Sequence, residues 1–120
     1  MATMNQVIEY VDRVKLNTYN DEDKYRWMRD LEGMVISSVL TEENESLSPP
    51  VDGDAELLVP EPYSEIYAFY VMAMIDFHNR EYDEYNNTVL LYMERLEAFK
   101  AWYIQNNRPK SYKKHLKVMG

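Results

Sequence analysis

The sequence predicts an all-α fold: a small four-helix domain with a long acidic, proline-containing loop between the second and third helices and a basic, extended carboxyl-terminal tail. Three observations predict this fold class. Apolar residues recur at helical spacing before Leu40, the segment Ile66–Ile75 carries no charge, and an apolar stripe with heptad spacing follows Tyr82. At 120 residues we expect one domain, residues 1–107 with the loop at 41–62, followed by the tail at 108–120.

The first helix is expected to begin near Thr3 or Asn5, because either side chain can cap free backbone amides, and to run to about Lys15. Its buried stripe consists of apolar residues at helical spacing: Met4, Val7, Ile8, Val11 and Val14. A turn over 16–20 should follow, because Asn17 and Asn20 disfavour continuation of the helix.

The second helix is expected to begin with Asn20 or Asp21 as its cap and to end near Leu40. Acidic residues in its first turn suit the positive end of the helix dipole. The predicted inner face comprises Tyr25, Met28, Leu31, Val35 and Val39. Trp27 lies to one side of that stripe, where it either edges the core or packs on a neighbour.

The third helix is predicted to carry Pro62 in its first turn, where a missing amide costs nothing, and to end near His78 and Asn79. It is apolar on nearly every side, so it must be central in a core or shared with a partner subunit.

The fourth helix carries a stripe with steps of three and four: Tyr82, Tyr85, Val89, Tyr92, Leu96, Phe99 and Tyr103. The short connection predicts antiparallel packing of this stripe on the third helix. Further apolar residues widen the surface beyond the stripe: Leu90, Leu91, Met93, Trp102 and Ile104. A monomer of this size has difficulty burying both faces of both helices, so we expect oligomerisation.

The loop at 41–62 is rich in acids and prolines and contains no basic residue. One interpretation is a solvated acidic insertion. The other starts from Leu57, Leu58 and Val59, an apolar patch that needs a cover, which an adjacent subunit could supply.

Charge divides the chain into a strongly acidic body and a basic tail, because every acidic residue precedes Asn107. The net charge is −8. An acidic body repels phosphate, which argues against a folded domain that clamps DNA. For the tail, contact with a protein and nonspecific contact with DNA remain alternatives.

Few residues suggest catalysis, and we expect neither an enzyme nor a cofactor. There is no cysteine and no glycine-rich phosphate loop, and His78 suits a structural role at a helix carboxyl end. Glu81 with Glu84, and Glu94 with Glu97, could hold Mg²⁺, as paired carboxylates do in all-α nucleotide pyrophosphohydrolases. Both pairs lie on one predicted helix, more than two turns apart, which disfavours convergence on one ion.

Nothing in the sequence predicts a membrane protein. The amino terminus lacks the pattern of a secretory signal, and the longest apolar run is about half of the roughly 20 residues that span a bilayer. The eleven tyrosines are better explained by a core and a subunit interface than by stacking of single-stranded nucleic acid, because few basic residues accompany them.

Several short elements occur in a distinctive order. Val11-Asp12 precedes Lys15 and Asn17-x-Tyr19; Trp27 and Leu31-Glu32-Gly33 share a helix; Leu57-Leu58-Val59-Pro60-x-Pro62-Tyr63 and Tyr85-Asn86-Asn87 follow. In these elements the chain from Val7 to about Pro109 resembles the head-to-tail connector (adaptor) proteins of long-tailed bacteriophages and prophages.

The resemblance implies a virion structural protein in the neck, at the head–tail junction, assembled in the host cytoplasm. It implies a homo-oligomeric ring, twelve-fold as in that family, which binds the portal protein above and a stopper or tail-completion protein below. Packaged double-stranded DNA would pass through the lumen without sequence-specific binding. The family docks on the portal largely through carboxyl-terminal segments.

The residues expected to form the subunit interface or core are Leu57, Leu58, Val59, Tyr63, Tyr67, Tyr70, Met74, Tyr85, Leu91 and Trp102. The residues expected to form the portal-binding tail are Arg108, Lys110, Tyr112, Lys113, Lys114, Leu116 and Lys117. The first alternative is a small helical module that regulates another protein through its aromatic face. An all-α Mg²⁺-dependent nucleotide hydrolase is the second.

Overall fold

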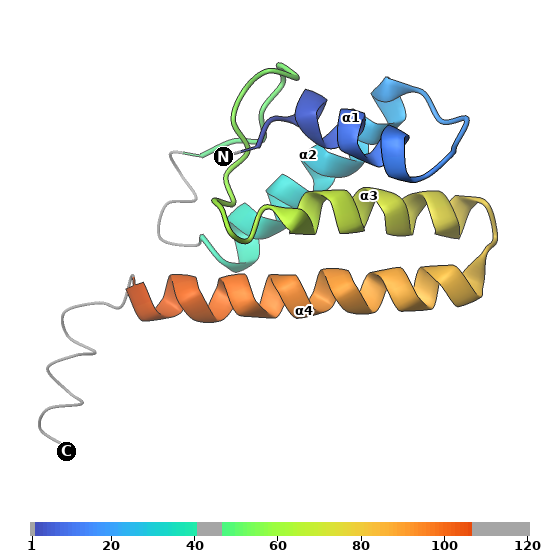
Figure 1. Cartoon of the computed structure of the whole chain (residues 1–120). Coiled ribbons are helices and arrows are strands. Elements are labelled where there is room, and N and C mark those ends of the chain that lie inside the picture. Colours follow the sequence, from blue (N-terminus) through green and yellow to red (C-terminus); the bar gives the residue numbers. More distant parts are fainter. Residues whose placement is uncertain (1, 41–46, 107–120) are drawn as a thin grey trace, which may run out of the picture.

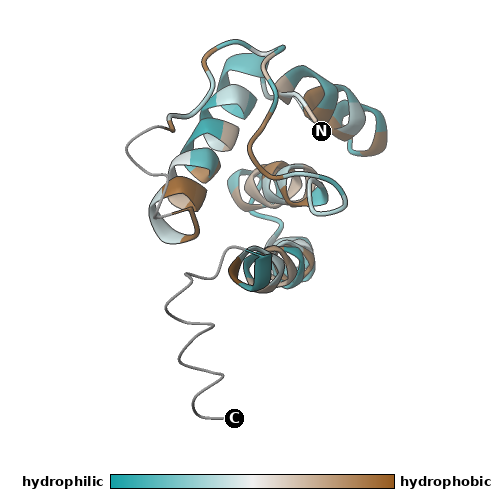
Figure 2. Cartoon of the chain, turned by 90° about the vertical axis from the view of Figure 1, so that its left-hand side faces the viewer, coloured by the Kyte–Doolittle hydropathy of each residue, from teal (hydrophilic) through white to brown (hydrophobic). Residues whose placement is uncertain are grey.

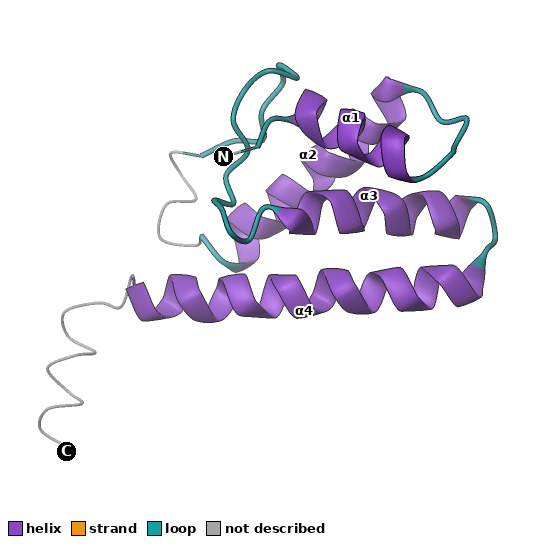
Figure 3. Cartoon of the chain, viewed as in Figure 1, coloured by secondary structure: helices purple, strands orange, loops and turns teal. Residues whose placement is uncertain are grey.

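The computed structural model describes residues 2–40 and 47–106. They form four helices, α1 (Met4–Val14), α2 (Asp21–Ser38), α3 (Glu65–His78) and α4 (Tyr82–Asn106), and no strand within the described ranges (Figure 1, Figure 3). The predicted all-α class is therefore confirmed. None of these helices combines the length and the apolarity that a membrane crossing requires.

Helix α3 is the centre of the fold. It packs against all three other helices, whereas α4 contacts only α3 among the described helices. Figure 2 shows α3 and α4 nearly end-on, with α3 between α4 on one side and the pair α1 and α2 on the other. Helices α3 and α4 run antiparallel and contact each other along α3 (Figure 1), which confirms the predicted pairing.

Helix α1 begins as its sequence predicts. Thr3 caps it: the Thr3 hydroxyl accepts the Gln6 amide N–H, and the Gln6 side chain accepts the Thr3 amide N–H. Met4, Val7, Ile8 and Val11 are buried, but Val14 is 53% exposed. The prediction for Val14 was wrong, because α1 ends at this residue and the chain turns away.

Helix α2 is capped by Asn20, whose side-chain oxygen accepts the Asp23 amide N–H at 2.9 Å. Its inner face buries Met28, Leu31 and Val35, while Tyr25 and Val39 are half-buried. Trp27 belongs to the core and stacks on His78 at 5.4 Å between ring centroids. Lys24 is also buried, with its Nζ 2.7 Å from Asp12 Oδ1 on α1.

The described part of the long loop packs on the body of its own chain through Leu57 and Val59, whereas its acidic side chains are exposed, as the solvated interpretation expects. The Leu57 amide donates to the Ala2 carbonyl oxygen at 2.8 Å, and the Asn5 amide donates to the Gly53 carbonyl oxygen at 3.0 Å. A Cβ on Gly53 would lie 2.6 Å from the Asn5 Oδ1, so glycine permits this close approach. Residues 41–46 of the predicted loop lie outside the described residues.

The start of α3 also differs from the prediction. Pro62 follows a cis peptide bond with Glu61 and lies before the helix, which begins at Glu65. A turn closed by the Tyr63 amide and the Pro60 carbonyl oxygen, at 2.9 Å, occupies this position instead. At the other end α3 stops at His78, as expected, and Arg80 adopts a left-handed conformation with φ of 61° in the corner before α4.

Candidate subunit interface

Helix α4 exposes apolar side chains on the face turned away from α3. Only Tyr92 and Phe99 are buried on this helix. The side chains of Leu90, Met93 and Ile104 are 64%, 52% and 60% exposed. We define the outer stripe of α4 as Leu90, Met93, Glu97, Ala101 and Ile104, which follow one another in steps of three and four. Such spacing presents one continuous face to a partner helix.

A second apolar surface flanks the outer stripe near the carboxyl end of α4. Trp102 is half-exposed there and borders a groove of about 260 Å³. The groove is lined by Leu40, Leu47, Leu58, Pro60, Phe99, Trp102 and Tyr103. The rings of Tyr63, Phe99 and Trp102 pack on one another with centroids 5.7 to 6.2 Å apart, which fixes the walls of this groove.

The residues predicted for the interface or core divide by their burial. Leu57, Val59 and Tyr67 are fully buried within the chain itself. The expectation that an adjacent subunit covers Leu57 and Val59 was therefore wrong, because α2 and α3 pack around them in the same core. Four predicted residues are half-buried beside that core: Leu58, Tyr63, Tyr70 and Met74. Tyr85 is half-buried beside Phe77, with ring centroids 5.5 Å apart. Leu91 and Trp102 are exposed and remain available to a partner.

A buried carboxylate holds the loop in place. Glu32 on α2 is fully buried; one carboxylate oxygen accepts the Tyr67 hydroxyl, and the other accepts the Leu58 amide N–H at 2.8 Å. The Tyr67 hydroxyl in turn accepts the Val59 amide N–H at 2.8 Å. Burial raises the pKa of Glu32, and the two hydrogen bonds oppose this rise only in part. Burial, with the charge of Glu32, also raises the pKa of Tyr67.

A pair of tyrosines, the half-buried Tyr70 on α3 and the buried Tyr92 on α4, packs between the two helices. The rings of Tyr70 and Tyr92 have centroids 5.2 Å apart. Burial, with a smaller contribution from Tyr70, raises the pKa of Tyr92 to about 12. Both hydroxyls therefore stay protonated at neutral pH, which suits a packing role.

The two glutamate pairs do not converge, as predicted, but one of them meets a third carboxylate at the corner between α3 and α4. Asp76, Glu81 and Glu84 place ligand atoms within 4.8 Å of one another, whereas Glu94 and Glu97 are not part of this group. The Lys15 Nζ lies 2.5 Å from the buried Asp76 Oδ1 and 3.5 Å from Glu84. Because the lysine already neutralises the buried charge, an ion-pair network accounts for the cluster.

Sequence reasoning missed Glu32, Lys24 and Asp76 as buried polar residues. A signal existed for two of them. Glu32 lies four residues after Met28 on the inner side of α2, and Asp76 is the one charged residue in a helix that is otherwise apolar from Ile66 to Phe77. The predicted tail residues, 108–120, lie outside the described residues.

Comparison with known proteins does not assign the chain to a family. No family model, no curated protein and no solved structure matches it.

Proposed function

We propose that this chain is a phage virion structural protein, a head-to-tail adaptor that assembles as a ring between the portal and a stopper or tail-completion protein. The observation that carries the proposal is the outer stripe of α4. A long helix that exposes Leu90, Met93 and Ile104 at regular spacing favours lateral association of copies. The sequence elements that resemble phage connectors supply the particular class.

The arrangement of the core supports a passive, structural role. The buried polar groups Glu32, Lys24 and Asp76 each have a partner within the chain and connect elements of the fold. The described part of the loop before α3, residues 47–62, is held by hydrogen bonds to α1 and α2 of its own chain, so this part needs no neighbour to fix it. Assembly of copies needs an exposed face, and the outer stripe of α4 provides it.

The acidic body fits the proposed place around a DNA channel. All 21 Asp and Glu residues precede Asn107, so the body repels the phosphates of packaged DNA. Repulsion lets DNA slide through a ring lumen without being retained. The basic tail is then the segment that reaches the portal.

Electron microscopy of the full chain mixed with the portal protein of the same genome tests the proposal. We expect a ring of twelve copies seated on one end of the portal. A full-length variant with reversed tail charges, Lys113→Glu, Lys114→Glu and Lys117→Glu, should keep the helical fold and lose attachment. Glu9→Lys, a charge reversal at an exposed position of α1, serves as the control and should attach normally. Absence of any ring on the portal, with both proteins folded, would contradict the adaptor role.

A further inference from the structure

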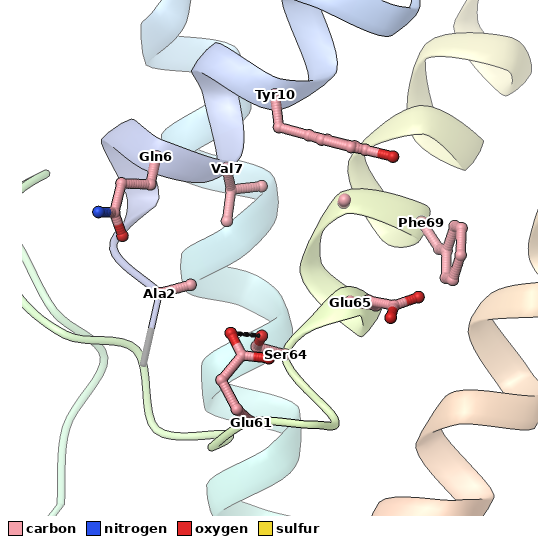
Figure 4. Close-up of a pocket in the computed structure, with 9 residues that line it drawn as sticks. Ala2, Gln6, Val7, Tyr10, Glu61, Ser64, Glu65 and Phe69 are labelled. Carbon is pink, nitrogen blue, oxygen red and sulfur yellow. Dashed lines mark hydrogen bonds between the residues drawn. The ribbon is translucent and has the colours of Figure 1, made fainter.

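A pocket between α1 and α3 belongs neither to the outer stripe of α4 nor to the buried network around Glu32. It has a volume of about 520 Å³. Helix α1 contributes Gln6, Val7 and Tyr10 to its lining, and α3 contributes Ala68 and Phe69. Figure 4 shows the Tyr10 side chain extending from α1 toward α3, with Glu61, Ser64 and Glu65 on the opposite side.

The pocket combines an apolar floor with an acidic rim. Val7, Ala68 and Phe69 supply the apolar surface. The carboxylates of Glu61 and Glu65 supply negative charge, and no lysine or arginine of the described residues lines the pocket. This combination suits an aliphatic side chain that is flanked by cationic ones.

The basic residues near the rim leave the carboxylates accessible. Ser64 is buried and its hydroxyl donates to Glu61. Arg95 on α4 lies 3.7 Å from Glu65, with both side chains about half-exposed, and Arg13 lies over the Tyr10 ring at 5.7 Å. An exposed pair such as Arg95 with Glu65 is weak in water, so an incoming cation can replace it.

The chain itself contains a segment of the matching chemistry. Five of its 13 Lys and Arg residues follow Asn107 and all 21 Asp and Glu precede it, so residues 1–107 carry a formal charge of −13 and the tail, 108–120, carries +5. In the tail, Leu116 stands between Lys113 and Lys117. A basic segment tethered to a body of this charge is strongly attracted to it.

The tail also starts within reach of the pocket. The Trp102 ring lies 5.7 Å from Tyr63, which places the end of α4 beside the start of α3, where Glu61 and Ser64 lie. An extended segment of the tail's length spans up to about 45 Å. Tethering raises the effective concentration of the tail at the pocket, which favours the same chain over a second copy.

We propose that this pocket binds the tail of the same chain, with Leu116 against the apolar floor and Lys113 and Lys117 beside Glu61 and Glu65. The inference goes beyond the adaptor role, because it concerns the free chain whatever the chain later joins. Docking in the pocket would withhold the tail from other acidic surfaces until one of them binds it more tightly.

The absence of cysteine allows a direct test on the full chain. A nitroxide attached at Gly120→Cys broadens the amide resonances of nearby residues. At low ionic strength we expect broadening to be strongest at the pocket residues Gln6, Ser64 and Phe69. It should weaken at high salt, because the carboxylates and lysines are exposed.

Matched variants separate docking from mere tethering. Glu61→Gln with Glu65→Gln should reduce the broadening at the pocket several-fold, and Leu116→Ser should do the same. Glu22→Gln with Asp83→Asn removes the same charge from exposed positions outside the pocket and should leave the broadening unchanged. The amide spectrum of each variant reports whether the fold is intact.

Three outcomes would overturn the inference. The first is uniform broadening that the pocket variants do not change. In the second, broadening is centred on the groove beside Trp102. The third is broadening that appears only when a spin-labelled copy is mixed with an isotope-labelled, unmodified copy, since this would assign the occupant to a second molecule.

Discussion

Helices α3 and α4 lie side by side, and both are rich in apolar and aromatic residues, yet their surroundings are opposite. Helix α3 buries residues around its whole circumference because α1, α2 and α4 all pack on it. Helix α4 buries only Tyr92 and Phe99 and presents its outer stripe to solvent. Apolar composition therefore marks the core in one helix and a candidate interface in the other, and the position in the fold decides between them.

Among the changes considered, truncation of an apolar side chain should show the largest difference in stability loss between α3 and α4. Ile75→Ala on α3 should lower the free energy of unfolding by about 2–5 kcal/mol, because the fully buried side chain leaves a cavity. Leu90→Ala on α4 should change it by less than about 0.5 kcal/mol. Urea denaturation of both variants measures the difference. Equal losses would mean that the outer stripe is already buried within the chain.

The ion pairs of the two helices should differ in the same direction. Lys15→Met leaves the buried carboxylate of Asp76 without its cation and should cost about 2–3 kcal/mol. Lys100→Met removes an exposed partner of Glu97 on α4 and should cost at most about 1 kcal/mol. Thermal unfolding at neutral pH provides the measurement. If the two variants have the same melting temperature, another group neutralises the charge of Asp76.

Hydroxyl removal tests the polar contacts of the two helices. Tyr67→Phe on α3 deprives Glu32 and the Val59 amide of a partner and should cost about 1–3 kcal/mol. Tyr92→Phe on α4 keeps the ring contact with Tyr70 and should cost less than about 0.5 kcal/mol. Chemical denaturation measures the free energy of unfolding of both variants. If Tyr67→Phe is as stable as the wild type, this hydroxyl does not hold the loop.

The buried carboxylate facing α3 should give stability a pH dependence. The pKa of Glu32 is raised in the folded chain, so the folded state keeps this proton at pH values where the unfolded state has lost it. Its contribution to the free energy of unfolding therefore falls as pH rises from the ordinary glutamate pKa through the raised value.

Comparison with Glu32→Gln isolates this contribution, since the variant lacks the titration. As pH rises through that interval, the wild type should lose stability relative to Glu32→Gln. The free energy of unfolding of Glu94→Gln on α4 should change with pH in the same way as that of the wild type. A wild type that gains stability relative to Glu32→Gln over the same range would reverse the assigned sign.

Much of the fold follows from local sequence. The cap at Thr3, the cap at Asn20 and the stripe Met4, Val7, Ile8 and Val11 are where helical spacing and capping chemistry place them. These features depend on residues within one or two turns, so a sequence alone specifies them.

The failures of prediction come from long-range contacts. Leu57 is buried because its amide pairs with Ala2, far away in the sequence, and Val59 because it meets Tyr67. Pro62 precedes α3 because a turn from Pro60 to Tyr63 takes its place. Of the candidate interface, the sequence predicted Leu91 and Trp102 and the apolar excess of α4. It could not say which face α3 would leave uncovered.

The self-association of the full chain tests the central claim, that the outer stripe of α4 is a surface between copies. Sedimentation over a wide range of protein concentration should show wild-type assemblies that grow with concentration. Leu90→Glu with Ile104→Glu should remain a monomer with unchanged thermal stability. Leu16→Glu, a charge placed on a 96% exposed side chain outside the outer stripe, should assemble like the wild type. A wild type that stays monomeric at every concentration, or a double variant that assembles equally well, would contradict the account.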